Sequence, residues 1–306
     1  YLLDYDSETS SFNSLAKYEK GVDHDHSIYS SGFNNKASLN LSWQYKGNFY
    51  WGINLNFHDI LVEKELRHVE SNFDSDSPIT DVDFRNYLTT NGSGISIQGG
   101  LIYKLKTIRL GLSYTTPTYY SFEDSLEQYI KTSSLDIDGN TFTDIVDPQI
   151  INLYDYDFKS PSKLSFSIAS IINNMIIISA DLVSKDYSNS KFKHDNDGLY
   201  NGLNSAIGKN LASVLDYKVG TEIKLNQFSL RGGYKASNSP YNNNEKKYIT
   251  SQTIGMGYDF NRSTLDLAVI SSKYNYNYQL FDTGLTDSAN IETNQLKLVF
   301  SYNIIF

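Results

Sequence analysis

Apolar and polar residues alternate at every second position along most of this chain, in segments of about ten residues. In ASLNLSWQY (37–45) the alternation puts alanine, leucine, tryptophan and tyrosine on one face and serine, asparagine and glutamine on the other. The stretch NFYWGINLNF (48–57) repeats the pattern, and only Lys46, Gly47 and Asn48 separate the two apolar stripes. This spacing predicts two antiparallel strands joined by a tight hairpin.

The same pattern recurs to the end of the chain. Further alternating segments begin near Ile95, Ile108, Leu164, Ile176, Leu215, Phe228, Ile254, Leu265 and Leu296. Short turns are expected at Lys106, Asn173, Asn174, Asn226 and Asn261. With the first hairpin, these segments make 11 predicted strands, and the last one keeps its alternation up to Phe306.

The connections between the predicted strands are alternately short and long. Long polar stretches near 62–92, 121–161 and 188–211 contrast with turns of a few residues. Outer-membrane barrels combine short periplasmic turns with long extracellular loops, so we predict an all-β transmembrane antiparallel β-barrel. We expect residues 1–32 to be an extracellular loop remnant and 33–306 to be the barrel. A soluble β-sandwich adhesin would show the same alternation, with its stripes buried between two sheets.

The face opposite the apolar stripes carries charged and polar residues of both signs. In a barrel this face lines the lumen. The candidate lining residues are His58, Arg109, Asp181, Lys218, Glu222, Arg231, Asp259 and Lys297. Because Lys218 and Glu222 lie on the segment next to the one that carries Arg231, we expect a mutually paired charge network that narrows the channel.

Composition and the absence of certain motifs exclude several other classes of protein. Acidic residues (35) exceed basic ones (26), the net charge is −9, and there is no basic stripe, so a nucleic-acid partner is not expected. The chain has no cysteine, which excludes disulfides and thiolate metal sites. No apolar run approaches the ~18 residues of a membrane helix. Neither G-x-S-x-G, H-E-x-x-H nor a phosphate-loop motif occurs, so we do not expect an enzyme.

Four stretches in order carry a family resemblance. They are GSGISIQGGLIYKLKTIRLGLSYTTPTYYSF (92–122), DYDFKSPSKLSFSIA (155–169), ISADLVSKDYSNSKF (178–192) and DYKVGTEIKLNQFSLRGGYKASNSPY (216–241). Together they resemble the FadL/TodX family of outer-membrane transporters for hydrophobic compounds, and most closely its Bacteroidota members. The resemblance runs from about residue 30 to the end of the chain.

This resemblance implies a barrel of fourteen strands with an N-terminal hatch. The 11 predicted strands would be the fourth to the fourteenth, so the hatch and the first three strands are expected outside this sequence. The implied function is passive uptake of a hydrophobic small molecule, such as a fatty acid or an aromatic compound. The mechanism implied is capture at the extracellular loops, then release by hatch rearrangement or laterally through the wall.

In the family, two long loops form an external capture groove, which maps onto 62–92 and 121–160 of this chain. SFEDSLEQYIK (121–131) fits a short helix capped by Ser121 or Ser125. We hypothesise that Phe122, Leu126, Tyr129 and Ile130 line the groove. The alternative is a loop helix that packs on the barrel rim.

We expect no metal site and no cofactor. DIDGNTFTD (136–144) has its glycine two positions too early for a calcium loop and lacks the distal glutamate. His24 and His26 in DHDHS could ligate a metal or haem, but two histidines in a polar loop are more often solvated.

The location that follows is the bacterial outer membrane. Closing the barrel would pair the last strand on both edges. Phe300, Tyr302 and Phe306 resemble the C-terminal signal read by the β-barrel assembly machinery. The expected partners are the lipid bilayer, a hydrophobic ligand and that machinery. The alternative function is a barrel subunit of a larger outer-membrane or secretion assembly, with other outer-membrane proteins as partners.

Overall fold

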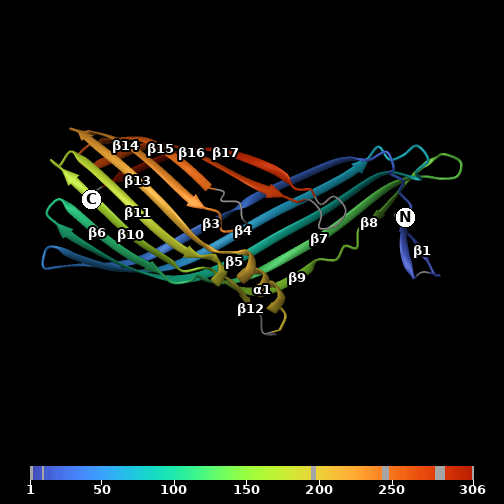
Figure 1. Cartoon of the computed structure of the whole chain (residues 1–306), viewed down its shortest axis with the longest axis horizontal. Coiled ribbons are helices and arrows are strands. Elements are labelled where there is room, and N and C mark those ends of the chain that lie inside the picture. The colour runs from blue at the N-terminus through green and yellow to red at the C-terminus, as the bar shows by residue number, and fades with distance from the viewer. Residues whose placement is uncertain (1–2, 9, 194–197, 243–247, 280–286, 305–306) are drawn as a thin grey trace. The chain divides into compact units, whose positions relative to one another are not determined.

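The computed structural model describes the chain except residues 1–2, 9, 194–197, 243–247, 280–286 and 305–306. It is almost entirely β-structure (Figure 1). The strands are β1 (Leu3–Asp6), β2 (Ser11–Ser14), β3 (Asp23–Tyr45), β4 (Phe49–Ser71), β5 (Ile79–Leu105), β6 (Ile108–Thr115), β7 (Tyr119–Leu135), β8 (Thr141–Val146), β9 (Asn152–Lys159), β10 (Lys163–Ile172), β11 (Ile176–Asp186), β12 (Lys191–Lys193), β13 (Ser213–Leu225), β14 (Phe228–Asn238), β15 (Tyr248–Asp259), β16 (Ser263–Tyr278) and β17 (Ala289–Ile304). The helices are a 3₁₀ turn, η1 (Tyr187–Asn189), and α1 (Asn201–Asn210). No helix in the described part of the chain is long and apolar enough to cross a membrane.

The chain divides into two compact units. Unit 1 comprises residues 1–36, 58–94 and 120–157, and unit 2 comprises 37–57, 95–119 and 158–306. β1 and β2 form a separate hairpin in unit 1, and all other strands belong to one sheet. The paired strands whose residue-by-residue register is described run antiparallel, for example β13 with β14 and β16 with β17. The predicted all-β antiparallel fold is confirmed.

The apolar stripe of each of the 11 alternating segments begins in its own strand of the sheet, namely β3 to β6, β10, β11 and β13 to β17. The turns also lie where the sequence predicts them. Lys46, Lys106, Asn173, Asn174, Asn226 and Asn261 all have positive φ. Asparagine tolerates this conformation, and two adjacent residues with positive φ suit the twist of a two-residue hairpin turn.

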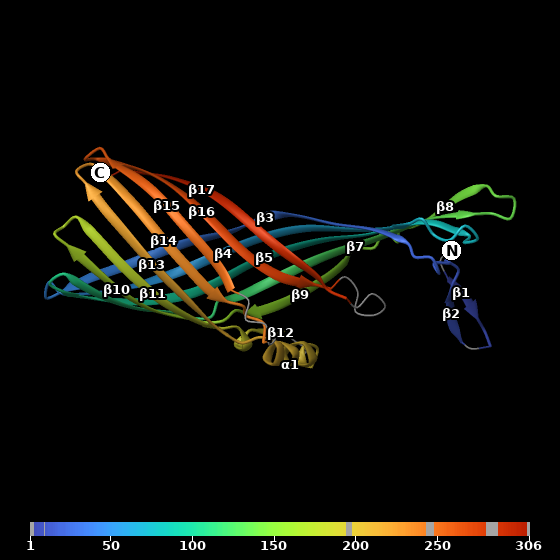
Figure 2. The same cartoon turned by 45° about the horizontal axis from the view of Figure 1, so that its top comes forward.

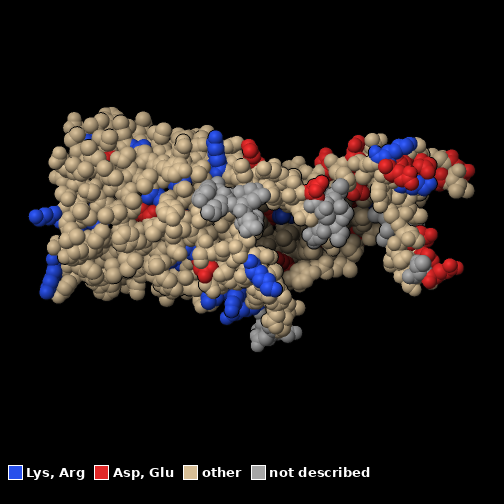
Figure 3. All heavy atoms as spheres, viewed as in Figure 1, with Lys and Arg blue, Asp and Glu red and all other residues tan. Residues whose placement is uncertain are grey.

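The two faces of the sheet differ in chemistry. Cross-strand partners share a face, and the registers link Gly111, Ser167, Asp181, Lys218 and Lys235 in one continuous row on what we call the inner face. The outer face carries the apolar stripes, which stay exposed: Leu41 is 61% and Ile254 75% exposed. In Figure 3 the surface over unit 2 shows few charged side chains.

Within the described residues, only four hydrophobic side chains are buried, namely Ile79, Val82, Val183 and Val214. A soluble β-sandwich would bury the stripes against a second sheet, whereas the strands of unit 2 form one layer (Figures 1 and 2) and their stripes stay exposed. The sandwich alternative is therefore wrong.

Two expectations about the loops need correction. The segments expected to be loops are largely ordered: β4 and β5 extend into 62–92, β7 to β9 fill much of 121–161, and β12 and α1 lie in 188–211. The region 1–32, expected to be a loop remnant, holds β1, β2 and the start of β3, and its extracellular position stays a prediction. Polar residues form strands here because a paired strand satisfies its own backbone whatever its side chains.

The last strand is not paired on both edges. In the described residues β17 pairs with β16 alone and β3 with β4 alone. Side chains on these edge strands are correspondingly open, with Leu39 67% and Leu298 73% exposed. Phe300 and Tyr302 lie on the outer face of β17, and Phe306 lies outside the described residues.

Candidate functional site

A charge network lies on the inner face of unit 2, as the sequence predicts. Arg231 on β14 donates from Nε to Glu222 on β13 at 2.7 Å and from Nη1 to Asp266 on β16. Gly257 on β15, which lies between Arg231 and Asp266, makes this approach possible because a Cβ there would collide with the Asp266 carboxylate. One guanidinium thus neutralises two carboxylates across four neighbouring strands.

A second network is centred on Asp216 of β13, which is 2% exposed. Ser237 donates to this carboxylate, and Lys185 and Lys235 lie 3.3 and 3.8 Å from it. Burial of a carboxylate is costly unless it is paired and hydrogen-bonded, and Asp216 is both. Alternation puts Asp216 on the same face as Lys218, but it predicts only the face and not the depth of burial.

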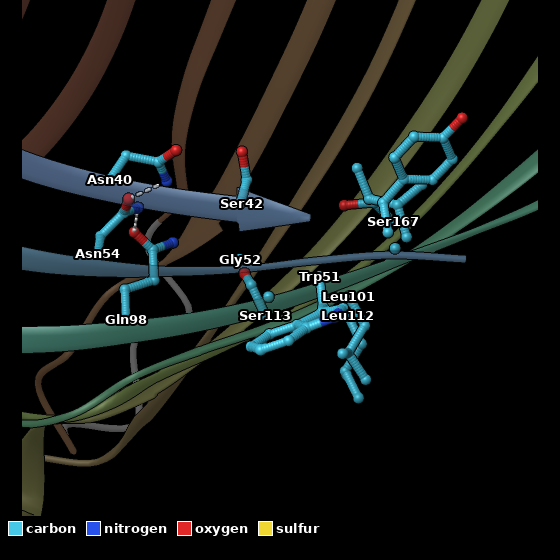
Figure 4. Close-up of a pocket in the computed structure, with 14 residues that line it drawn as sticks. Asn40, Ser42, Trp51, Gly52, Asn54, Gln98, Leu101, Leu112, Ser113 and Ser167 are labelled. Atoms are coloured by element: carbon cyan, nitrogen blue, oxygen red, sulfur yellow. Dashed lines mark hydrogen bonds between the residues drawn. The ribbon is translucent and has the colours of Figure 1, made fainter. Parts of the chain in front are cut away.

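A neutral polar ladder covers the inner face of β3, β4 and β5. Asn40 donates to Asn54, and Asn54 donates to Gln98 at 3.1 Å. One step along the strands, Ser38 donates to Asn56 at 2.8 Å, and Asn56 is 2% exposed. Figure 4 shows Asn40, Asn54 and Gln98 directed toward one another. Around Asn54 the inner face therefore carries amide and hydroxyl dipoles, and the nearest charge on β5 is Lys104, further along the strand.

A cavity of about 480 Å³ borders this ladder. Its walls come from β3, β4, β5, β6 and β10 and include both inner-face polar groups and outer-face apolar ones. The lining residues are Asn40, Ser42, Tyr50, Trp51, Gly52, Asn54, Gln98, Gly100, Leu101, Ile102, Gly111, Leu112, Ser113 and Ser167 (Figure 4). A volume of this size falls within the range of small-molecule sites.

A groove of about 370 Å³ adjoins the same part of the wall. It also has Ile53, Gly99, Tyr114 and Leu164 in its lining. The cavity and the groove share six lining residues, which are Trp51, Gly52, Gly100, Leu101, Leu112 and Ser113. We call Gly52, Gly99, Gly100 and Gly111 the glycine patch.

At the glycine patch three adjacent strands, β4, β5 and β6, carry residues without side chains close together. A Cβ at Gly99 would meet nothing within 4 Å, and a Cβ at Gly100 would meet nothing closer than 3.7 Å. Glycine is unfavourable inside a strand because it packs nothing and loses more entropy on folding. The patch is therefore a position where the wall is thin, at a cost to the stability of the sheet.

The predicted lumen residues occupy the inner face. Cross-strand partners place Asp181 opposite Lys218, Glu222 opposite Arg231, Arg109 opposite Lys104, Asp259 opposite Thr264, and Lys297 opposite Ile270. Of these residues, Glu222 and Arg231 form a recorded ion pair with each other. His58 lies in unit 1, where its ring is 5.6 Å from that of Tyr120. Their role in lining a channel stays a prediction.

The predicted ligand groove is not on a helix. Phe122, Leu126, Tyr129 and Ile130 all lie on strand β7. Because side chains alternate in a strand, Phe122, Leu126 and Ile130 share one face and Tyr129 points to the other, where its ring lies 5.7 Å from Arg85. Phe122 packs on Tyr120 and Tyr156. The helical spacing was misleading because residues four apart share a face in an α-helix and also in a β-strand.

In unit 1, His24 and His26 are not simply solvated. His24 contacts His68 and Glu70, and the ring of His26 lies 5.6 Å from that of His68. The register of the β3–β4 hairpin could have predicted these contacts. The partners Asn40 and Asn54, Ser38 and Asn56, and Ser31 and Glu63 have residue numbers that always sum to 94. The same sum pairs His26 with His68 and His24 with Glu70.

No family model matches the chain, and no curated protein matches it. Among solved structures, the chain is similar to the CymD monoaromatic hydrocarbon channel, with a TM-score of 0.47, 12% identity, and coverage of 95% of this chain and 89% of that one. It is similar to the toluene transporter TodX of Pseudomonas putida, with a TM-score of 0.47, 15% identity, and coverage of 93% and 88%. The alcaligin outer-membrane receptor FauA of Bordetella pertussis has a TM-score of 0.34 and 9% identity, with coverage of 96% of this chain and 60% of that one.

TodX belongs to the family that the sequence resembles. The same holds for CymD. The assignment to Bacteroidota members stays a prediction.

Proposed function

We propose that this chain lets a small hydrophobic compound cross the bacterial outer membrane passively, without enzymatic chemistry. The observation that carries the proposal is the shared wall at the glycine patch, where the cavity and the groove have six lining residues in common. At Gly52, Gly99 and Gly100 a compound in the cavity would have little more than backbone between it and the outer face, beside the larger side chains of the shared lining.

The membrane location is supported by the chemistry of the two faces. Exposed leucine, isoleucine and aromatic side chains on the outer face of unit 2 would be unfavourable in water and favourable in lipid. Unpaired backbone groups cost several kcal/mol each inside a bilayer. The edges of β3 and β17 would therefore need further strands, such as the three expected from the family resemblance, to close the barrel.

The cavity favours a neutral compound over a fatty acid. Its described lining residues offer amides, hydroxyls and apolar surface, and none of them is basic. A carboxylate would lose its hydration there without gaining a cation among the lining residues, whereas an aromatic hydrocarbon has no charge to desolvate. A cavity of only about 150 Å³ holds benzene, so the size suffices for an aromatic compound of one or two rings.

A second function, as a barrel subunit of a larger outer-membrane assembly, is favoured by one observation. In the described residues β3 and β17 each have a single paired neighbour, and such edges pair readily with other chains. If this is the main function, partners will co-purify after mild detergent extraction and uptake will be no greater than in cells lacking the chain.

The proposal is tested by expressing the protein in bacteria that lack their own hydrophobic-compound channels and measuring the uptake of radiolabelled toluene and oleate. The expected result is faster toluene uptake than with empty vector and a smaller effect on oleate. Liposomes containing the purified protein should not swell in sugars, since the route is not an open aqueous pore. Toluene uptake equal to the empty-vector control would contradict the proposal.

A further inference from the structure

We infer that His24, His68 and Glu70 form a binding site for a first-row transition-metal dication, for which Zn²⁺ is the representative ion. The three side chains lie in unit 1, His24 on β3 and the other two on the paired strand β4. The site is independent of the transport proposed above, because it shares no residue with the cavity or the groove.

Three donor atoms converge in this cluster. His24 Nδ1 lies 3.4 Å from His68 Nε2, His68 Nε2 lies 3.3 Å from Glu70 Oε1, and His24 Nδ1 lies 3.6 Å from the same oxygen. All three separations exceed the usual ~2.9 Å of an N–H···O hydrogen bond.

The separations match the edges of a coordination tetrahedron. Zinc binds histidine nitrogen at about 2.0–2.1 Å and carboxylate oxygen at about 2.0–2.2 Å, so two ligands in a tetrahedron lie roughly 3.3–3.5 Å apart. The observed triangle of 3.3, 3.4 and 3.6 Å has that size. A single ion above the triangle would contact all three donors after only small side-chain movements.

The surroundings hold the donors in place. The His68 side chain is 10% exposed, and those of His24 and Glu70 are 27% and 29% exposed. The rings of His24 and His68 stack with centroids 5.3 Å apart, and the two strands fix the backbone on both sides. Little side-chain entropy remains to be lost on binding, so the cluster is preorganised.

The donor set selects the class of ligand. Two imidazoles and one carboxylate suit zinc, copper or nickel and are poor ligands for calcium, which takes six to eight oxygens. Haem does not fit, since porphyrin nitrogens occupy the positions adjacent to an axial ligand and only one of the three donors could reach the iron. Three protein ligands leave a fourth position for water or a small anion.

The test uses the full chain in detergent micelles, stripped with a chelator and titrated with Zn²⁺ by calorimetry. The expected result is one ion bound per chain. His24→Ala, His68→Ala and Glu70→Gln should each weaken binding at least about tenfold, the smallest loss seen when even an outer-shell partner of a metal site is removed. His58→Ala is the matched control and should keep both stoichiometry and affinity.

Two further measurements separate ligation from structural effects. Co²⁺ in place of Zn²⁺ should give the intense visible absorption of tetrahedral cobalt, and Glu70→Gln should change that spectrum even if it folds normally. Heat-modifiable gel mobility checks the fold of each variant. The inference is overturned if the wild-type chain binds no Zn²⁺, if binding survives all three substitutions, or if hemin binds with a Soret shift that His24→Ala and His68→Ala abolish.

Discussion

The side chain of Asn54 donates a hydrogen bond of 3.1 Å to Gln98 across the β4–β5 pair and accepts one from Asn40. Asn54→Leu would remove both of these hydrogen bonds, so that Asn40 and Gln98 lose Asn54 as a partner. Each such bond contributes a net ~0.5–1.5 kcal/mol, so the free energy of unfolding should fall by about 1–3 kcal/mol. Urea titration in lipid vesicles measures this. Asn303→Leu is the control, because Asn303 donates to Thr264 at 3.2 Å on an exposed edge and should cost less.

The chain has two tryptophans, Trp43 and Trp51, and both lie on the outer face of unit 2 with their rings stacked 4.4 Å apart. They are 47% and 42% exposed. If this face contacts lipid, vesicles made with brominated acyl chains should quench most of the intrinsic tryptophan fluorescence, and soluble acrylamide should quench little. The opposite ranking of the two quenchers would rule out the membrane location.

Arg231 pairs with two carboxylates, so replacing it should lower the free energy of unfolding more than replacing either carboxylate. Arg231→Leu removes the cation that Glu222 and Asp266 share, and leaves only the exposed Lys224 near Glu222. Loss of one partner of a buried pair costs about 3–5 kcal/mol, and because these side chains are 20–39% exposed we expect about 1–3 kcal/mol. The triple variant with Glu222→Gln and Asp266→Asn should recover most of the loss.

The control for Arg231 is Lys224→Leu. Lys224 lies 3.9 Å from Glu222 with its side chain 54% exposed, so its loss should cost less than about 0.5 kcal/mol. Equal effects of the two single variants in urea unfolding would show that the network adds nothing to stability.

A third charge cluster, in unit 1, gives a prediction for pH. Hydrogen bonds from Arg85 and Arg67, opposed by burial, hold the pKa of Asp83 well below its usual value. A lowered carboxyl pKa contributes stability above the unfolded pKa of about 3.9 and loses it as the pH falls toward the folded value. The contribution should therefore be complete at pH 7 and decline at pH values below about 4.

Hydrogen exchange of β4 and β5 residues in unit 1 tests this. At pH 7, Asp83→Asn should lower the local opening free energy by about 1 kcal/mol, a modest value because Arg67 and Arg85 are 44% and 32% exposed. The difference from wild type should shrink below pH 3. Asp81→Asn, two positions away and exposed, is the control. A difference that is as large at pH 2 as at pH 7 would contradict the assignment.

The sheet could be predicted from the sequence because its signal is local. Alternation fixes which residues share a face, and asparagine or lysine at positive φ marks each turn, so 11 strands and their hairpins follow directly. The Glu222–Arg231 pair could be predicted for the same reason, since the two residues lie on strands joined by one short turn.

The rest depends on pairing that the alternation does not specify. In SFEDSLEQYIK the apolar spacing fits a helix, but the segment pairs with strands on both sides and becomes β7. The His24, His68 and Glu70 cluster needs the β3–β4 register to be carried far beyond the apolar stripes. Predicting the cavity at the glycine patch requires the registers of β4, β5 and β6 relative to one another, and no single segment of sequence specifies them.

The central claim, that a hydrophobic compound passes through the cavity at the glycine patch, is tested most directly by comparing Gly100→Phe with Gly233→Phe. Both glycines lie on the inner face of a strand, and the nearest atoms to an added Cβ are 3.7 Å away at Gly100 and 3.6 Å away at Gly233, so both substitutions should fold. Only Gly100 lines the cavity. We predict that Gly100→Phe lowers toluene uptake at least tenfold at unchanged outer-membrane levels and that Gly233→Phe leaves it within twofold of wild type. Equal uptake by the two variants would contradict the account.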